Sequence, residues 1–280
     1  MINDWLNRFQ DSLSELYPAR EAKNIAYIVL QKVCDCGMTD LLVGRHDTLT
    51  EEQQLRTENI LDRLSEGEPL QYILGEGEFH GLTFEVNHNV LIPRPETAEL
   101  VDWISDDFLD KGGSFLDVGT GSGCIAITLK YLNEKFSAHA TDVSPLALDT
   151  ARRNATSLNT EVDFLLDDIR HPQVHFERLD FIVSNPPYIT EEEKEEMRGN
   201  VLDHEPHLAL FVEDKDPLLF YKAIAEYGLQ CLKNGGYLYF EINEHLGKET
   251  AQMLSDKAYK DVIIKEDLEG KERMIRCKKR

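Results

Sequence analysis

Residues Ser114 to Leu129 read SFLDVGTGSGCIAITL and carry the clearest sign of the fold. Residues 114–118 form a short apolar run typical of a buried strand, and the apolar residues after position 123 recur with helical spacing. Between them lies a loop with glycines at positions 119, 121 and 123. A strand, a glycine loop and a helix in this order open many nucleotide-binding α/β sheets, because glycine lets the backbone approach a ligand closely. The stretch therefore predicts a largely parallel sheet with a ligand site at this loop.

The spacing of the three glycines restricts the kind of ligand. The dinucleotide fingerprint is Gly-x-Gly-x-x-Gly or Gly-x-Gly-x-x-Ala, whereas here the third glycine comes two residues after the second and position 124 is Cys. This spacing is wrong for holding a pyrophosphate at the helix N-terminus. It favours a ligand with an adenosine but no phosphate, whose amino-acid part lies along the loop. The expected contacts are Gly119, Thr120, Gly121, Ser122 and Gly123.

Two acidic residues follow the next two predicted strands. The first strand brings Asp142 to a point about 20 residues past the glycines, where a carboxylate accepts both hydroxyls of a ribose. Asp142 could instead cap the helix that follows, although Ser144 is better placed for that role. The second strand leads to Asp168, which is expected to accept a hydrogen bond from the amino group of adenine. A solvated acid at the strand end is an equally good interpretation of Asp168.

The sequence Asn185-Pro186-Pro187-Tyr188 directly follows a fourth apolar run, at 179–184. Each proline fixes φ at about −65° and lacks an N–H, so the turn is stiff and presents mainly carbonyl acceptors. Such a frame suits a planar group that carries an NH2. The Asn185 side-chain oxygen and the Pro186 carbonyl are expected to accept its two N–H bonds. Tyr188 is expected to pack on its face, and Pro187 to keep the turn from relaxing. A proline-rich turn with a buried tyrosine is the alternative interpretation.

Residues 1–75 are expected to form a helical domain. Apolar residues recur at three- and four-residue steps along 2–16 and along 22–33, and Asp40 is expected to begin a short third helix. Thr50 opens a fourth helix with a capping box. Because this part of the chain holds no cluster of side chains suited to catalysis, we expect it to serve in packing or in recognition of a partner.

Residues 76–92 are expected to form a β-hairpin linker that turns at Asn87-His88-Asn89. Residues 93–280 are expected to form an α/β domain that starts with a helix after Pro95, ending at Gly112. Further strands are expected near 114, 137, 162, 179 and 236, and further helices near 124, 146, 217 and 246. This alternation predicts a mainly parallel sheet with helices on both faces, and the last two strands of the chain supply an antiparallel edge.

The composition limits the partners that we expect. With 52 acidic against 30 basic residues the formal net charge is −22, whereas non-specific nucleic-acid binding depends on lysine and arginine neutralising phosphates. No apolar stretch reaches membrane-spanning length, the N-terminus lacks the basic start and apolar run of a signal peptide, and the five cysteines show no zinc spacing. We therefore expect a cytoplasmic protein with reduced thiols, no metal, and no direct nucleic-acid or membrane partner. We also expect a monomer, although nothing in the composition decides the oligomeric state.

Four further motifs accompany the glycine loop, Asp142, Asp168 and the Asn185 turn. They are GEPLQYILG at 67–75, EFHG at 78–81, LIPRPET at 91–97 and EPHLAL at 205–210. Together these motifs resemble the release factor glutamine methyltransferases, the PrmC or HemK family, over essentially the whole chain. The resemblance implies a Rossmann-like class I methyltransferase domain with a seven-stranded sheet, preceded by a small all-helical domain that recognises the release factor.

The resemblance also implies an activity. The enzyme would take a methyl group from S-adenosyl-L-methionine, leaving S-adenosyl-L-homocysteine, and place it on a side-chain amide nitrogen. The target would be N5 of the glutamine in the Gly-Gly-Gln motif of peptide chain release factors. Asn185, Pro186 and Tyr188 would then be catalytic, Pro187 would help to bind the substrate, and Asn185 would also border the cofactor.

Two positions depart from the family pattern, and other activities stay open. Ala98 stands where an acid is common, and Asp168 where an aromatic residue is common. An adenine-N6 DNA methyltransferase presents a similar turn to an exocyclic amine, and a sister enzyme that methylates a glutamine of a ribosomal protein would share the site chemistry. A nicotinamide dehydrogenase would use the glycine loop and Asp142, but the glycine spacing argues against it. A non-catalytic helical adaptor would leave the Asn185 turn unexplained.

Several other polar residues have a structural interpretation. Arg94, held between two prolines, is expected to pair with an acid such as Glu96. Glu241 is expected to be a satisfied acid at the end of a strand. The histidines on either side of Glu205 and Pro206 are expected to lie on a surface loop rather than in a metal site, and we assign Glu205 no chemical step.

Overall fold

The computed structural model describes residues 2–44, 48–190, 193–196, 199–212 and 215–280 of the 280-residue chain. The chain divides into two compact units. The smaller unit consists of Met1–Leu74 with Gly199–His204, which forms helix α9, and the larger unit consists of Gly75–Arg198 with Glu205–Arg280. Each unit buries a hydrophobic core of its own. No helix in the described part of the chain is long and apolar enough to cross a membrane.

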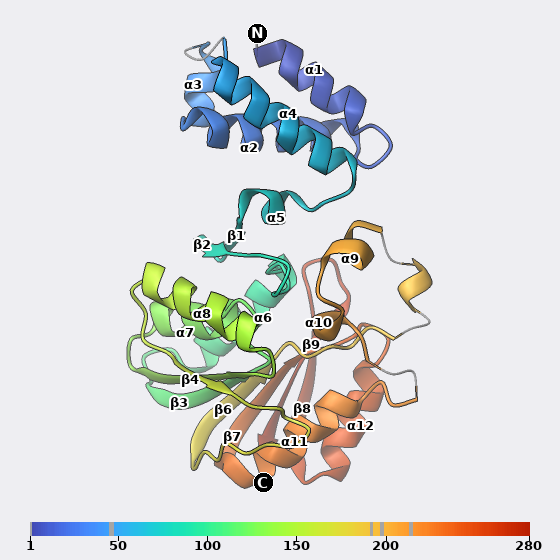
Figure 1. The fold of residues 1–280 in the computed structure, drawn as a ribbon. Coiled ribbons are helices and arrows are strands. Elements are labelled where there is room, and N and C mark those ends of the chain that lie inside the picture. The colour runs from blue at the N-terminus through green and yellow to red at the C-terminus, as the bar shows by residue number, and fades with distance from the viewer. Residues whose placement is uncertain (1, 45–47, 191–192, 197–198, 213–214) are drawn as a thin grey trace. The chain divides into compact units, whose positions relative to one another are not determined.

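Helices make up the N-terminal part of the smaller unit (Figure 1): α1 (Ile2–Ser12), α2 (Ala19–Cys34), α3 (Met38–Leu42), α4 (Glu51–Ser65) and α5 (Leu70–Leu74). Apolar positions at three- and four-residue steps, such as Trp5 and Phe9, are buried in a common core of α1, α2 and α4. Thr50 forms the expected capping box with Gln53, whose backbone N–H donates to the Thr50 hydroxyl at 3.2 Å. The helical prediction for this segment is confirmed.

Two helix boundaries in the smaller unit differ from the prediction. α1 ends at Ser12, so Leu16 lies beyond the helix and is 46% exposed. α3 begins at Met38 rather than at Asp40. The reason is that the Asp40 carboxylate accepts the Gly37 N–H at 3.3 Å and so supports the first turn of the helix from inside it. The short helix α5 has no counterpart in the prediction.

A hairpin opens the larger unit, with β1 (Glu76–Phe79) paired antiparallel to β2 (Leu82–Glu85). The turn lies at His80-Gly81, whose φ angles of 52° and 74° are the left-handed values that a two-residue type I′ turn requires. The prediction of a hairpin turn at Asn87-His88-Asn89 is therefore wrong. These residues do form a turn, in which the Val90 N–H donates to the Asn87 carbonyl at 3.0 Å. That turn follows the hairpin instead of closing it.

A seven-stranded sheet forms the centre of the larger unit (Figure 1). Its strands are β3 (Gly113–Val118), β4 (Phe136–Asp142), β5 (Asp163–Leu166), β6 (Leu179–Ser184), β7 (Leu232–Glu241), β8 (Tyr259–Glu266) and β9 (Glu272–Lys279). They lie in the order β5-β4-β3-β6-β7-β9-β8, and the pairs from β5 to β7 are parallel. β9 is antiparallel to both β7 and β8. The predicted α/β sheet, mainly parallel with antiparallel pairing at one edge, is confirmed.

Helices cover both faces of this sheet. They are α6 (Pro95–Asp107), α7 (Cys124–Leu132), α8 (Pro145–Ser157), α11 (Leu219–Cys231) and α12 (Gly247–Asp256), with a short α10 (His207–Leu210) and a 3₁₀ turn (Glu193–Glu196). Side chains of α6 and α7 belong to the core on one face, and those of α11 and α12 to the core on the other. α6 ends at Asp107 instead of reaching Gly112, because the chain turns through Asp110 at a φ of 61° before Gly113 begins β3.

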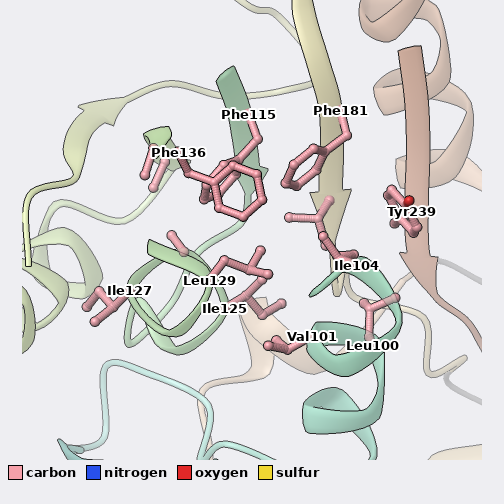
Figure 2. Packing of buried hydrophobic residues seen from close by; sticks show 14 of the residues in the cluster. Leu100, Val101, Ile104, Phe115, Ile125, Ile127, Leu129, Phe136, Phe181 and Tyr239 are labelled. Carbon is pink, nitrogen blue, oxygen red and sulfur yellow. The ribbon is translucent and has the colours of Figure 1, made fainter. Parts of the chain in front are cut away.

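Aromatic rings fill the core between the sheet and the helices α6 and α7 (Figure 2). Phe115 of β3 and Phe181 of β6 stack with their ring centroids 4.8 Å apart, and Phe136 of β4 meets each of them edge-on at 5.5 Å. Leu100 and Ile104 of α6 are fully buried in the same cluster. This packing holds three neighbouring strands together and so positions the loops at their ends.

Replacing Phe181 by Ala is expected to lower the free energy of unfolding by about 3–5 kcal/mol, because the ring is fully buried and its removal leaves a cavity. Urea denaturation followed by circular dichroism measures this loss. Leu268→Ala is the control, since Leu268 is 92% exposed and its loss should change stability by less than about 0.5 kcal/mol. A loss below about 1 kcal/mol for Phe181→Ala would contradict the packing described here.

Candidate active site

A cavity of about 260 Å³ opens at the carboxyl ends of the parallel strands. Its wall includes residues at or just after the ends of β3, β4, β5 and β6, among them Gly119, Asp142, Asp168 and Asn185. All of its lining residues belong to the larger unit. The strand order reverses between β3 and β6, and ligands of open α/β sheets bind outside such a reversal. We call this space the strand-end cavity.

The glycine loop follows β3 as predicted. Gly119 and Gly121 have φ angles of 74° and 56°, in the left-handed region that glycine adopts without strain. The Gly121 N–H donates to Asp142 Oδ2 at 2.9 Å, and the Gly119 N–H donates to the Thr141 carbonyl at 2.8 Å. The end of β4 therefore holds the loop in place, and residues 119–122 all line the cavity.

Gly123 differs from the other residues of the loop, because it is not part of the described cavity wall. A Cβ atom at this position would lie 2.7 Å from Ile127 Cδ1 and 3.2 Å from Ala151 Cβ. Its φ of 83° is also left-handed. A side chain at this position would therefore be strained and would crowd Ile127 of α7 and Ala151 of α8, and the contact of Gly123 with a ligand stays a prediction.

Asp142 lines the cavity at the end of β4, where it was predicted to hold a ribose. Its two oxygens accept the N–H groups of Gly121 and of Ser144, at 2.9 and 2.8 Å. Each oxygen keeps a further lone pair for a hydroxyl donor. Burial raises the pKa of Asp142, and the two backbone hydrogen bonds oppose that rise. Ser144 caps α8 by accepting the Ala147 N–H, as expected, which leaves Asp142 free for the cavity.

Asp168 also lines the cavity, but its carboxylate is already paired. Arg170 donates from Nε to Oδ1 at 3.0 Å and from Nη2 to Oδ2 at 2.8 Å, and its backbone N–H donates to Oδ1 as well. These hydrogen bonds hold the pKa of Asp168 below its ordinary value. Asp168 is thus an acid paired with Arg170 at the strand end, neither solvated and unpaired nor kept free for a ligand, and its contact with adenine stays a prediction.

The Asn185 turn forms the opposite side of the cavity, with Asn185, Pro186 and Pro187 in its wall. Asn185 Nδ2 donates to Thr97 Oγ1 at 3.2 Å, and the Thr97 hydroxyl donates to Glu241 Oε2 at 2.6 Å. Thr97 lies in the first turn of α6 and Glu241 is the last residue of β7. Since the Asn185 NH2 is directed to Thr97, the side-chain oxygen is the part of the amide left for a ligand.

Tyr188 does not belong to the described wall of the strand-end cavity. Its ring packs against the core formed with α11, and its hydroxyl donates to Glu241 Oε1 at 3.1 Å. Asn243 Nδ2 donates to the Tyr188 carbonyl at 3.2 Å. Burial and the nearby Glu241 carboxylate raise the pKa of Tyr188 well above its ordinary value. Tyr188 therefore anchors the turn through the core and Glu241, and its packing on a substrate stays a prediction.

Arg94 pairs with Glu205 and not with Glu96. Its Nη2 donates to Glu205 Oε1 at 2.5 Å, and the Ile92 N–H donates to Oε2 at 3.4 Å. Glu205 is 4% exposed, so this ion pair ties two distant segments of the chain together beside the cavity.

Within the described residues, no group of three or more His, Cys, Asp and Glu side chains is placed to hold a metal ion.

Thr97 and Glu241 belong to the site although no sequence motif places them there. Thr97 closes the motif at 91–97, and Glu241 was expected to be a satisfied strand-end acid, which it is. The missing signal was spatial: β6 and β7 are parallel neighbours in which Ser184 pairs with Phe240, so Asn185 and Glu241 leave the sheet side by side. Two adjacent strand ends with polar residues would have been the signal to look for.

The cavity wall fits a ligand that has a ribose and an amino-acid part but no phosphate. Its two described arginines, Arg94 and Arg170, each bind a carboxylate already, so neither is left for a pyrophosphate. Ser122 Oγ is buried at the wall and has no hydrogen-bond partner among the described residues. Asp142 offers acceptors to hydroxyl groups. A ligand with hydroxyl and amino groups would form hydrogen bonds with both Ser122 Oγ and the Asp142 carboxylate.

This fold and this cavity define a class I S-adenosylmethionine-dependent methyltransferase. The crystal structure of a methyltransferase from Pyrococcus furiosus aligns with 79% of this chain and 98% of that chain, with a TM-score of 0.54 and 18% sequence identity, and so shares the fold. The family model of the PrmC N-terminal domain matches residues 4–75, and that of the methyltransferase small domain matches residues 96–205.

Two relatives resemble the chain over nearly its whole length. A release factor glutamine methyltransferase from Flavobacterium psychrophilum is 44% identical over 280 residues, which cover 99% of this chain and 98% of that protein. A second, from Bacteroides thetaiotaomicron, is 44% identical over 95% of this chain and 96% of that protein. The chain belongs to the release factor glutamine methyltransferase family, which confirms the resemblance found in its motifs.

Replacing Asp142 by Ala is expected to weaken the binding of S-adenosylhomocysteine by about 10- to 100-fold, because it removes a charged acceptor of hydrogen bonds. It also frees the N–H of Gly121 that holds the glycine loop. Isothermal titration calorimetry measures the dissociation constant. Asp149→Ala is the matched control, since Asp149 lies on α8 with its side chain 57% exposed. An affinity within about threefold of the unaltered protein would exclude Asp142 as a cofactor contact.

Asp117, at the base of the glycine loop, should make stability depend on pH. Burial raises the pKa of this carboxyl to about 7, from an ordinary value of 3.8. Between these values the folded chain binds a proton that the unfolded chain has lost, so stability falls as pH rises from about 4 to about 7. The variant Asp117→Asn lacks this proton. Urea unfolding at pH 5 and at pH 8 measures the free energy of unfolding of both proteins. The unaltered protein minus Asp117→Asn should give a more positive difference at pH 5 than at pH 8. The same difference at both pH values would contradict a raised pKa of Asp117.

Proposed function

We propose that this chain transfers the methyl group of S-adenosylmethionine to the side-chain amide nitrogen of a glutamine in peptide chain release factors. The observation that carries the proposal is the orientation of Asn185, whose NH2 donates to Thr97 and whose oxygen is left for a substrate at the cavity wall. Membership of the family, with 44% identity over nearly the full length of two relatives, supports the choice of substrate. The target is the glutamine of the Gly-Gly-Gln motif.

A carboxamide nitrogen is a poor nucleophile because its lone pair is delocalised into the carbonyl. Bound S-adenosylmethionine supplies an electrophilic methyl group on a sulfonium. The task of the chain is therefore to orient the amide. Asn185 Oδ1 and the Pro186 carbonyl oxygen accept hydrogen bonds from the two N–H groups of the substrate amide. These hydrogen bonds fix the plane of the amide and favour the positive charge that develops on its nitrogen. Two consecutive prolines keep these acceptors still, since each has a fixed φ.

The anchors behind the turn complete this arrangement. Pro187 stiffens the wall, and Tyr188 holds the turn through its hydroxyl on Glu241 and its carbonyl on Asn243. Residues 119–122 and Asp142 hold the amino-acid and ribose parts of the cofactor. In this scheme the substrate proton leaves after the nitrogen has been alkylated, so the mechanism requires no general base.

The other parts of the chain have proposed roles that follow from the same assignment. Residues 1–75 recognise the release factor, residues 76–92 link them to the catalytic domain, and residues 93–280 carry out the transfer. The net charge of −22 argues against direct binding to nucleic acid. We place the enzyme in the cytoplasm, where release factors act, as a monomer.

The substrate assignment is tested by offering purified release factors, ribosomal proteins and DNA together with methyl-labelled S-adenosylmethionine. Mass spectrometry of the labelled product then locates the methyl group. Label on the glutamine of Gly-Gly-Gln in a release factor is the expected result. Label on a ribosomal protein glutamine or on adenine, with none on release factors, would overturn the proposal.

Asn185→Ala is expected to lower kcat by about 10²- to 10³-fold, the size of effect seen when one preorganised hydrogen-bonding group is removed from an active site. The dissociation constant for S-adenosylhomocysteine should stay within about threefold, because the glycine loop and Asp142 are untouched. Asn133→Ala is the control, since Asn133 follows the C-terminal end of α7, away from the glycine loop at its start. A parallel loss of turnover and cofactor affinity would assign Asn185 to cofactor binding instead.

A further inference from the structure

We propose that Thr97 and Glu241 form a hydrogen-bond relay that decides which end of the Asn185 amide faces the substrate. Both are positioning residues that act through Asn185. This inference rests on the proposed function, because it concerns the acceptor that Asn185 offers to a glutamine amide.

The relay is short, buried and continuous. Asn185 Nδ2 donates to Thr97 Oγ1 at 3.2 Å, and Thr97 Oγ1 donates to Glu241 Oε2 at 2.6 Å. Thr97 is 2% exposed and Glu241 is 1% exposed, so the bond between these two residues is shielded from water. A hydrogen bond to a charged acceptor is stronger than one between neutral groups, and the short distance between Thr97 and Glu241 is typical of such a bond.

The carboxylate gives the relay its direction. An ionised Glu241 has acceptors only, so the single hydroxyl proton of Thr97 must point towards it. The Thr97 oxygen then has only lone pairs left for Asn185. The Asn185 amide can satisfy them only with its NH2, which turns its oxygen to the cavity. Without Glu241 the hydroxyl proton of Thr97 could point to Asn185. The Asn185 amide could then turn its oxygen to Thr97 and its NH2 to the NH2 of the substrate, where two donors would face each other.

A second donor keeps the carboxylate in its accepting role. The Tyr188 hydroxyl donates to Glu241 Oε1 at 3.1 Å, so both oxygens of the carboxylate receive a hydroxyl proton. Burial raises the pKa of Glu241, and the hydrogen bonds from Thr97 and Tyr188, together with the nearby charge of Arg273, oppose that rise. Tyr188, the last residue of the turn, therefore helps to fix the orientation of Asn185, the first residue of the same turn.

Three segments far apart in the sequence bring these residues together. Thr97 belongs to the first turn of α6, Asn185 follows β6, and Glu241 ends β7. The parallel pairing of β6 with β7 places the last two at adjacent strand ends. The motif that contains Thr97 thereby acquires a role in the reaction, although the Thr97 hydroxyl is directed at Glu241 and not at a ligand.

Thr97→Val is the decisive variant, because it keeps the shape of the side chain and removes the hydroxyl. We expect kcat to fall by about 10- to 100-fold while the Michaelis constants for both substrates stay within about threefold, since an orientation is lost and the binding groups remain. Thr97→Ser restores the hydroxyl and should recover at least about one third of kcat. Equal turnover in Thr97→Val and the unaltered enzyme would overturn the relay.

Thr128→Val is the matched control. Thr128 is fully buried in α7, and its hydroxyl has no hydrogen-bond partner among the described residues. The same change of hydroxyl to methyl in the same domain therefore removes no hydrogen bond, and kcat should not change. If Thr128→Val loses as much turnover as Thr97→Val, the effect is one of general packing, and the relay is refuted.

A double-variant cycle tests whether Glu241 acts through Thr97. Glu241→Leu, which removes the acceptor, should lower kcat, and the combination with Thr97→Val should be no worse than the more damaged single variant, because both act on the same amide. Losses that multiply would show independent roles and contradict the relay. Should Glu241→Leu fail to fold, judged by its lack of a thermal shift with S-adenosylhomocysteine, the comparison of Thr97→Val with Thr97→Ser still decides.

The same assay separates the relay from the function on which it rests. An unaltered enzyme that does not methylate a release factor overturns the proposed function. An enzyme that is active on the release factor but insensitive to Thr97→Val overturns the relay alone. A loss of S-adenosylhomocysteine affinity in Thr97→Val that matches the loss of turnover would make Thr97 a cofactor contact, and the relay would again be refuted.

Discussion

Glu241 is a buried carboxylate whose two oxygens each receive a hydroxyl proton, one from Thr97 and one from Tyr188. Burying a charge in this way is costly unless it is fully hydrogen-bonded. In return, the carboxylate joins the start of α6, the end of β7 and the turn after β6 in a single network. The orientation of Asn185, and with it the chemistry proposed for the cavity, depends on this one constraint.

The sheet brings two different walls of the strand-end cavity together. The glycine loop and Asp142 form a wall suited to a ribose and an amino acid, held by backbone hydrogen bonds from the end of β4. The Asn185 turn forms the other wall, with stiff carbonyl acceptors. Both lie at the carboxyl ends of parallel strands that are hydrogen-bonded to one another and whose Phe115 and Phe181 rings stack in the core. A rigid sheet of this kind suits a reaction whose main difficulty is orientation.

The sequence was sufficient for the features that are local or periodic. The alternation of strands and helices, the cap at Ser144 and the glycine loop all depend on residues close together in the chain, and the structure confirms them. The pairing of Arg94 with Glu205 spans more than 100 positions and could not be read from spacing. Motifs do not distinguish contact with a ligand from packing, so the ligand contacts of Gly123 and Tyr188 stay predictions. The structure adds to them the close approach of Gly123 to Ile127 and the hydrogen bond of Tyr188 to Glu241, which no motif indicates.

In the proposed reaction the Asn185 oxygen, directed by Thr97 and Glu241, accepts a hydrogen bond from an N–H of the substrate amide. A crystal structure of the enzyme with S-adenosylhomocysteine and a release factor would show whether it does. We expect the glutamine nitrogen within about 3.2 Å of both Asn185 Oδ1 and the Pro186 carbonyl oxygen, with Asn185 still hydrogen-bonded to Thr97. A glutamine nitrogen more than about 4 Å from Asn185, or an Asn185 side chain that has left Thr97, would contradict it.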